Sequence, residues 1–470
     1  MENRIPRRIT FLEAMFVIVF LIAALMSTLM LFGGDPHMPI LAATVVASLI
    51  AIRAGFKWSD IEEGIIDTIR MSMQAILILM IIGAIIGTWI LAGIVPTMIF
   101  YGLKILSPGI FLIATCLICA IVSLATGSSW TTAGTVGIAL LGVGGGLGIP
   151  LPIVAGAIIS GAYFGDKMSP LSDTTNLAPA MAGANLFDHI KHMIFTTGPS
   201  LIIALVLYGI IGFRYAGQDL DVAGINMILD TLGDQFAINP LLLLPPILVI
   251  AMVIFKVPAI PGLIGGTLLG AIFAALFQGA GMSEIIDAAH YGFVSETGIE
   301  AVDELLTRGG LDSMMWTISL ILVAMSFGGT LEKTGMLEVI AEKILAFAKS
   351  TGSLVTATIL TCIFTNLTTG DQYLSIVVPG RMYRQIFADR GLHPKNLSRC
   401  LEDSGTLTSP LVPWNTCGAF MMSTLGIHPF AYLPYTFLNL INPLVSIFYG
   451  FTGITMEKLP EVDTRTGKQN

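Results

Sequence analysis

The chain is a succession of long apolar segments separated by short polar ones. Eight of these segments approach or exceed the roughly 20 helical residues that cross a hydrocarbon core of about 30 Å. They predict membrane-crossing α-helices over residues 10–32, 38–54, 73–94, 194–213, 240–255, 257–277, 314–329 and 430–450.

Composition points to the same fold class. Apolar residue types make up 54% of the 470 residues and charged types only 11%, whereas soluble domains carry about 25% charged residues. Mean hydropathy is +0.84. These values exclude a soluble enzyme, a disordered chain and a nucleic-acid-binding protein. The sequence therefore predicts an all-α polytopic membrane protein that is embedded in a lipid bilayer.

Four other apolar stretches are interrupted by polar residues together with Gly or Pro. Non-helical polar backbone is tolerated at membrane depth only where protein or a watery cavity satisfies its amide groups. The first and third interruptions have the pattern expected of the tip of a re-entrant hairpin, and the second and fourth that of an interrupted helix. They lie at residues 126–130, 165–176, 368–372 and 404–416.

The interruptions repeat along the chain. The pattern Gly-x-x-x-Ser-Pro-Leu at 165–171 recurs at 405–411, and Thr126-Gly127 recurs as Thr369-Gly370. Shared order and near-constant spacing indicate two copies, at about 10–213 and 240–450. We expect each copy to hold three crossings, a re-entrant hairpin, an interrupted crossing and one closing crossing.

Five crossings per copy is an odd number, so the second copy is expected to be inverted in the membrane. With both termini in the cytoplasm, this topology puts 19 of the 23 Lys and Arg residues inside and three outside, as the positive-inside rule requires. The polar interruptions all fall in the second half of each copy. The expected organisation is a scaffold formed by 10–107 and 240–350, a transport domain formed by 108–213 and 351–450, an extracytoplasmic linker at 214–239 and a cytoplasmic tail at 451–470.

Inverted repeats with broken helices are typical of secondary transporters, and the interruptions supply hard oxygen atoms suited to Na⁺. The chain has no Walker A sequence. We therefore expect transport to be coupled to an ion gradient, and we expect no cofactor. Acidic residues within the bilayer are functional candidates by default. The expected ion- or substrate-binding residues are Asp173, Asp371, Asp166, Ser128, Ser129, Ser172, Thr174, Asn176, Thr369 and Asn415, among which Asp173, Thr174, Ser128 and Asp371 are the expected Na⁺ ligands.

Antiport needs an acid that takes either Na⁺ or a proton, and a carboxyl group buried at mid-membrane holds its proton more readily. Asp173 fits this role best because hydroxyl and amide groups flank it and no cation adjoins it. Asp166 is less suited because Lys167 could pair with it. Glu402 and Asp403 are expected near the cytoplasmic entrance. The six His residues are expected in loops or interfacial segments.

The segments 165–176, 126–130 and 408–415 together resemble the NhaC-type Na⁺/H⁺ antiporters, over nearly the whole chain. The resemblance implies a bacterial or archaeal inner-membrane homodimer that exchanges Na⁺ for H⁺ by elevator-like alternating access. Some relatives exchange malate and lactate, so a Na⁺- or H⁺-coupled carboxylate exchanger is the alternative. A dicarboxylate usually requires Arg, and the four interruptions contain only Lys167 as a basic residue.

Overall fold

The computed structural model describes residues 6–216, 222–255, 257–346 and 348–459. Within these ranges the chain is helical, and extended pairing is limited to two isolated bridges, Phe293–Arg308 and Leu392–Lys458. Lys256, parts of the predicted linker 214–239 and most of the predicted tail 451–470 lie outside or at the edge of the described residues.

The α-helices are numbered along the chain. Their bounds are α1 Phe11–Met26, α2 His37–Arg53, α3 Trp58–Leu91, α4 Ile94–Ile105, α5 Pro108–Thr126, α6 Ser129–Thr132, α7 Ile138–Gly146, α8 Leu151–Met168, α9 Asp173–Ala182, α10 Leu186–Ala216, α11 Val222–Gln235, α12 Leu244–Ile254, α13 Ala259–Phe273, α14 Met282–Tyr291, α15 Glu300–Leu306, α16 Met315–Lys333, α17 Met336–Leu345, α18 Thr351–Thr369, α19 Leu374–Asp389, α20 Pro394–Leu401, α21 Thr416–Leu425, α22 Pro429–Tyr432 and α23 Phe437–Thr452.

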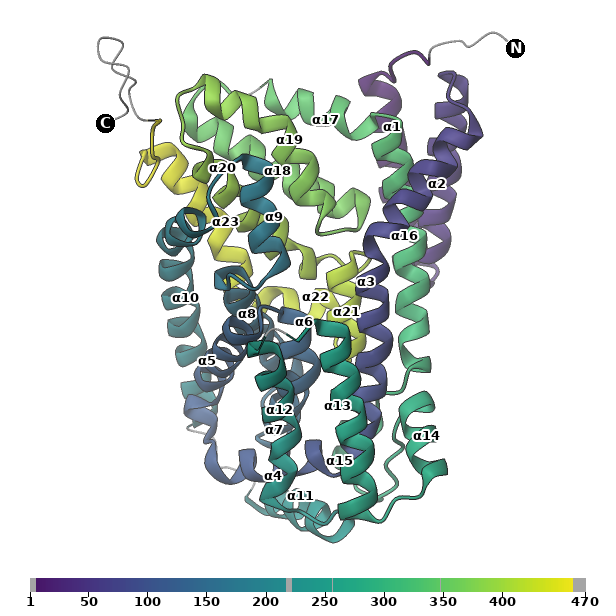
Figure 1. Ribbon diagram of the computed structural model, residues 1–470, viewed down its shortest axis with the longest axis vertical. Helices are drawn as coiled ribbons and strands as arrows, with labels where there is room; N and C mark the ends of the chain where they lie inside the picture. The colour runs from purple at the N-terminus through teal and green to yellow at the C-terminus, as the bar shows by residue number, and fades with distance from the viewer. Residues whose placement is uncertain (1–5, 217–221, 256, 347, 460–470) are drawn as a thin grey trace.

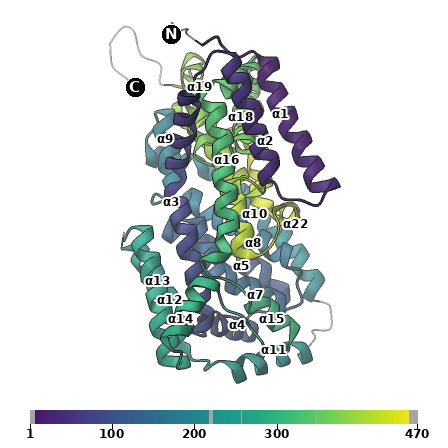
Figure 2. The ribbon, with the colours of Figure 1, turned by 90° about the vertical axis from the view of Figure 1, so that its right-hand side faces the viewer.

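Two helical hairpins occupy opposite ends of the molecule. The α1–α2 hairpin lies at the same end of the molecule as α19 and the C-terminal end of α23. The α12–α13 hairpin lies at the other end (Figure 1). The long helices α3 and α16 pack together between them (Figure 2). Among the described residues, six helices are long and apolar enough to cross a membrane, or seven if the bent pair α11–α12 is one span. The protein is therefore a multi-pass α-helical membrane protein.

Two pairs of helices at matching places in the two predicted sequence copies have the same length and the same kind of C-terminal end. Both α5 and α18 contain 19 residues and end at a left-handed glycine, Gly127 or Gly370. Both α9 and α21 contain 10 residues and end at Gly183 or Gly426 in the same conformation. Glycine adopts this helix-ending conformation without steric strain because it lacks a Cβ atom. The sequence repeat thus corresponds to repeated local structure.

Close helix packing depends on small residues, as is common in membranes. The α5–α8 contact is built on Gly161 and Gly165, where an added Cβ atom would lie within 3.0 Å of side-chain atoms of α5. The Ser123 hydroxyl of α5 donates a hydrogen bond of 2.6 Å to the Ala162 carbonyl of α8. This tight contact fixes the position of the C-terminal end of α8, where Asp166 stands.

Several predicted boundaries differ from the structure. The predicted crossing 73–94 belongs to the 34-residue helix α3, which begins at Trp58. The predicted crossing 430–450 is divided, because α22 ends at Tyr432 and a 3₁₀ turn precedes α23. The first helix break is shorter than 165–176, since α8 continues to Met168. Pro170 disfavours helical backbone at the residue before it, which places the end of α8 there.

Candidate ion-binding site

A pocket of about 490 Å³ lies where the tip of the α5–α6 hairpin meets the break between α8 and α9. Gly127 at the tip packs against this break, because a Cβ atom there would lie 2.7 Å from Leu171. Helix α3 and residues 257–259, before and at the start of α13, line other sides of the pocket. Gln372 and Thr416 also line the pocket, so each of the four predicted interruptions contributes at least one lining residue.

Asp166 is the buried acid of this pocket, with 5% of its surface exposed. Its Oδ2 atom accepts hydrogen bonds from the Ser129 backbone N–H at 3.0 Å and from the Ser129 hydroxyl at 2.6 Å. Its Oδ1 atom has no hydrogen-bond partner among the described residues. That oxygen keeps its lone pairs available for a cation.

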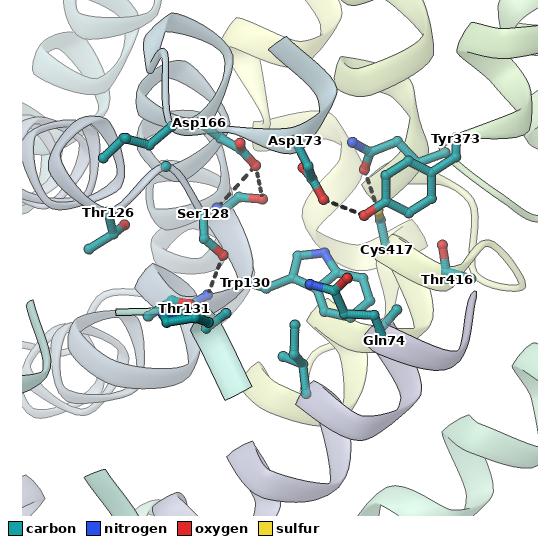
Figure 3. Close-up of a pocket in the computed structure, with 18 of the residues that line it drawn as sticks. Gln74, Thr126, Ser128, Trp130, Thr131, Asp166, Asp173, Tyr373, Thr416 and Cys417 are labelled. Carbon is teal, nitrogen blue, oxygen red and sulfur yellow. Dashed lines mark hydrogen bonds between the residues drawn. The ribbon is translucent and has the colours of Figure 1, made fainter. Parts of the chain in front are cut away.

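Asp173 is the second acid of the pocket and begins helix α9. The Tyr373 hydroxyl, from the start of the second hairpin's returning segment, donates a hydrogen bond to its Oδ2 atom (Figure 3). The position at a helix N-terminus favours negative charge. The side chain is exposed toward the pocket, which differs from the buried environment expected for it. Asp166 is the pocket acid that is withdrawn from water.

The hydroxyl groups around the two acids have separate local roles. The Ser128 hydroxyl accepts a hydrogen bond of 3.1 Å from the Thr131 N–H and so caps α6 at the pocket. The Ser172 hydroxyl caps α9 and lies 3.1 Å from the Thr174 hydroxyl. Ser128 and Ser129 line the pocket, while Ser172 and Thr174 are buried directly behind it.

Three other predicted site residues lie outside the pocket lining. Asn176 donates hydrogen bonds to the carbonyls of Pro170 and Ser172 and stabilises the break. The Thr369 hydroxyl donates to a carbonyl one turn earlier in α18, at 2.8 Å. Asn415 caps α21 and contacts Asn366 of the second hairpin at 3.0 Å. Their polar groups hold the backbone of the interruptions in place.

Asp371 lies between α18 and α19 and contacts α3. Its Oδ2 atom accepts a hydrogen bond of 3.2 Å from Ser72 of α3, and its Oδ1 atom accepts one of 2.9 Å from the Leu374 N–H. The side chain is 1% exposed. Its sequence neighbours Gln372 and Tyr373 line the pocket instead.

The pocket also contains residues that the sequence reasoning did not select for it. Gln74 of α3, Tyr373 and Cys417 line it. Trp130 also lines it and stacks on Phe420 with ring centroids 4.2 Å apart. Tyr373 directly follows the predicted tip 368–372, and this position could have indicated that it lines the pocket. Gln74 lies within an apolar helix and gave no comparable signal. Among the described residues that line the pocket, none is basic.

Lys167 does not pair with its neighbour Asp166. It forms an ion pair with Asp403, and both side chains are fully buried. The same Asp403 oxygen accepts hydrogen bonds from Thr196 at 3.0 Å and Asn442 at 2.7 Å. Asp403 and Glu402 were expected near the cytoplasmic entrance, but both have 0% exposure, because η6, the π-helical segment Glu402–Thr406, packs among α8, α9, α18, α19, α20 and α23.

Two histidines also differ from the expectation of loop or interfacial positions. His189 and His192 lie in α10 with 0% and 4% exposure. The Nε2 atom of His192 lies 3.2 Å from the Asn396 side-chain oxygen. Both histidines are inside the protein because α10 begins at Leu186 and packs against α20. No group of three or more His, Cys, Asp or Glu side chains in the described part of the chain could hold a metal ion.

A multi-pass helical protein with two acids and several hydroxyl groups around an internal pocket has the form of a secondary ion transporter. The model of the Na⁺/H⁺ antiporter family matches residues 161–454. The chain belongs to this family.

Its relatives match over nearly their whole lengths. The chain is 41% identical to the Na⁺/H⁺ antiporter NhaC of Alkalihalophilus pseudofirmus, covering 95% of this chain and 96% of that protein. It is 39% identical to a malate-2H⁺/Na⁺-lactate antiporter of Bacillus subtilis, covering 94% and 95%. It is 38% identical to the arginine/ornithine antiporter ArcD of Halobacterium salinarum, covering 98% and 96%. These relatives are antiporters, and the chain is a transporter and not an enzyme.

Proposed function

We propose that the protein is a secondary active antiporter that exports Na⁺ in exchange for H⁺. The observation that carries this proposal is the pocket itself, in which Asp166 and Asp173 lie among hydroxyl groups and no described lining residue is basic. Carboxylate and hydroxyl oxygens suit a hard cation. Family membership and the antiporter relatives support the same activity.

The proposed Na⁺ ligands are the free Oδ1 atom of Asp166, the carboxylate of Asp173 and hydroxyl oxygens of Ser128 and Ser129. Thr174 and Ser172 would join them after a small movement of the break, since their hydroxyls are buried next to it. Asp371 would act from the scaffold boundary, where Ser72 holds it. Na⁺ and H⁺ are the transported ions, and we propose no resident cofactor.

The test is Na⁺ binding and Na⁺/H⁺ exchange by purified protein in liposomes. Asp166→Asn and Asp173→Asn should each lower Na⁺ affinity at least tenfold, because each removes a charge that neutralises the ion. Asp188→Asn, at an exposed position in the first turn of α10, is the matched control and should bind as the wild type does. Wild-type binding by both pocket variants would refute the site.

A second candidate function is Na⁺- or H⁺-coupled exchange of small carboxylates, which the malate/lactate relative favours. A carboxylate substrate needs cationic or multiple neutral donors. Lys167 is fully buried and engaged by Asp403, so it is not available to a solute in the pocket. Liposomes given Na⁺ alone, and then malate with lactate, separate the two functions: carboxylate-dependent exchange without Na⁺/H⁺ exchange would support the second.

We further propose that the two copies are inverted repeats and that 108–213 with 351–450 move as an elevator against 10–107 with 240–350. Matched helices α5 and α18, and α9 and α21, support the repeat. Packing supports the division. In the first group α10 packs against α5, α8 and α23, and α23 packs against α18; in the second group α3 packs against α13 and α16, and α2 packs against α1 and α16. The pocket lies at the boundary of the two groups.

The proposed setting is the inner membrane of a bacterium or archaeon, with a homodimer and cytoplasmic termini. Single cysteines at the exposed positions Asp389 and Lys104 test the topology, since the five native cysteines are buried. Labelling should reach Asp389→Cys from the cytoplasm and Lys104→Cys from outside. Labelling of both from the same side would contradict the inverted repeat. Mass measurement of the detergent-solubilised protein tests the dimer.

A further inference from the structure

The pocket of about 490 Å³ is larger than a dehydrated Na⁺ ion requires. Hard cations are held by oxygen atoms at roughly 2–2.6 Å, so an ion site is only as wide as its ligands. Pockets that bind small organic molecules have volumes of about 300–1,000 Å³. The proposed Na⁺ ligands therefore occupy one part of a pocket that has room for an organic solute.

The acidic part of this pocket suits a cation that carries several hydrogen-bond donors. Asp166 is 5% exposed, and its Oδ1 atom has no hydrogen-bond partner among the described residues. The Asp173 Oδ1 atom accepts one hydrogen bond of 2.8 Å, from the Thr174 N–H, and its Oδ2 atom accepts one from the Tyr373 hydroxyl. A carboxylate has about four acceptor positions, so both acids can accept further bonds from a solute.

An aromatic side chain borders the same pocket. Trp130 stacks on Phe420 with ring planes inclined by 13°, which covers one face of the indole. Trp130 also lines the pocket together with Asp166 and Asp173 (Figure 3). Cations bind favourably over aromatic rings, and indole is the best of them. A planar guanidinium group can stack on such a ring while its N–H groups reach a carboxylate.

The remaining lining includes apolar side chains that cannot ligate Na⁺. Ala75 and Ile78 of α3 belong to it, as do residues 257–259 before and at the start of α13. Sites for small organic molecules typically combine such apolar surface with a few placed polar groups. This part of the pocket can accommodate a short carbon chain.

We infer that the pocket binds small organic cations that carry a guanidinium group, and that the protein exchanges them for H⁺ at the site proposed for Na⁺. This inference rests on the proposed function, because the same carboxylates neutralise either cation. The guanidinium N–H groups donate hydrogen bonds to the free Asp166 oxygen and to Asp173, and the guanidinium plane lies against Trp130. Na⁺ and the organic cation exclude each other because they share these acids.

The experiment measures binding and exchange of guanidinium and methylguanidinium by purified protein in liposomes, at concentrations too low to unfold the protein. Both cations should displace Na⁺, and both should cross the membrane when a proton gradient drives exchange. Urea and methylurea have nearly the same shapes without the charge, and as matched controls they should do neither. Methylguanidinium should bind about three- to fourfold more tightly than guanidinium, because its methyl group is buried against the apolar lining.

Two substitutions test whether the organic cation binds in this pocket. Asp166→Asn should weaken guanidinium binding about tenfold or more, because it removes a charged acceptor. Trp130→Leu should weaken guanidinium binding by about five- to thirtyfold relative to Na⁺ binding, since only the organic cation uses the ring. Trp130→Phe should restore part of this preference. Asp188→Asn, on the exposed surface of α10, should bind guanidinium as the wild type does.

The outcomes separate this inference from the proposed function. Na⁺/H⁺ exchange by a wild-type protein that does not bind guanidinium would overturn the inference alone. Guanidinium binding that persists unchanged in both Asp166→Asn and Trp130→Leu would also overturn it, because the cation would then bind elsewhere. Absence of Na⁺/H⁺ exchange in the wild type would instead overturn the proposed function.

Discussion

Gly165→Ala tests whether the α5–α8 contact positions the Na⁺ site. The added Cβ atom would lie 2.6 Å from the Ser123 Cβ atom and would also meet backbone of α5, whereas nonbonded carbon atoms rest about 3.5–4.0 Å apart. Helix α8 would therefore have to move away from α5 by about 1 Å. The neighbouring Asp166 would move with it.

The displacement is large compared with the hydrogen bonds that hold Asp166. Ser129 contacts it at 2.6 and 3.0 Å, and a shift of about 1 Å takes such contacts to or beyond the limit of about 3.5 Å. Overpacking destabilises by about 1–3 kcal/mol and each lost bond to a charged group by about 1.5–3 kcal/mol. Alanine regains about 1 kcal/mol of helix propensity. With one of the two bonds lost, these contributions give a net destabilisation of about 2–5 kcal/mol.

The assay combines thermal unfolding of the purified protein with Na⁺ binding. Gly165→Ala should lower the melting temperature and weaken Na⁺ binding at least tenfold. Gly262→Ala is the matched control, because no atom lies within 4 Å of its added Cβ atom in α13. It should leave Na⁺ binding unchanged and stabilise by up to about 1 kcal/mol. If Gly165→Ala bound Na⁺ and melted as the wild type does, the reasoning from helix contact to site geometry would be wrong.

Three further predictions concern other contacts. Asp403→Leu leaves Lys167 buried without its partner and should destabilise the folded protein by about 3–5 kcal/mol. In thermal unfolding, the double variant Lys167→Met/Asp403→Leu should recover part of this lost stability. Equal stability of the single and double variants would contradict the pairing. A disulfide between Thr317→Cys of α16 and Ser423→Cys of α21, whose native hydroxyls are hydrogen-bonded, should stop transport while Na⁺ binding persists, and full turnover of the cross-linked protein would argue against an elevator. Hydrogen bonds from the backbone and side chain of Thr297 lower the pKa of Asp303, which lies in α15 within the segment 292–311. The stabilising contribution of Asp303 should therefore be complete above about pH 4 and lost as pH falls below it. Proteolysis of the segment 292–311 should accelerate in Asp303→Asn at neutral pH, and an unchanged cleavage rate would count against the role of Asp303.

The sequence by itself determined the fold class and the positions of the irregular backbone. The length of the apolar segments and their low charge predict membrane-spanning helices. A helix pairs its own backbone groups, and each unpaired group is costly in hydrocarbon. Gly127 and Gly370 mark helix ends because their backbone adopts a conformation that favours glycine. The acids Asp166 and Asp173 were recognisable because charges in apolar surroundings are rarely retained without a role.

Only the tertiary structure decided which of these groups meet. Lys167 follows Asp166 in the chain but pairs with Asp403, 236 residues away, and Tyr373 reaches Asp173 across a separation of 200 residues. Burial was equally unreadable from sequence order, since Asp173 is exposed to the pocket while Glu402 is enclosed. The reason is physical: sequence patterns record local backbone preference, whereas the charge state and partners of a side chain depend on helices that distant segments bring beside it.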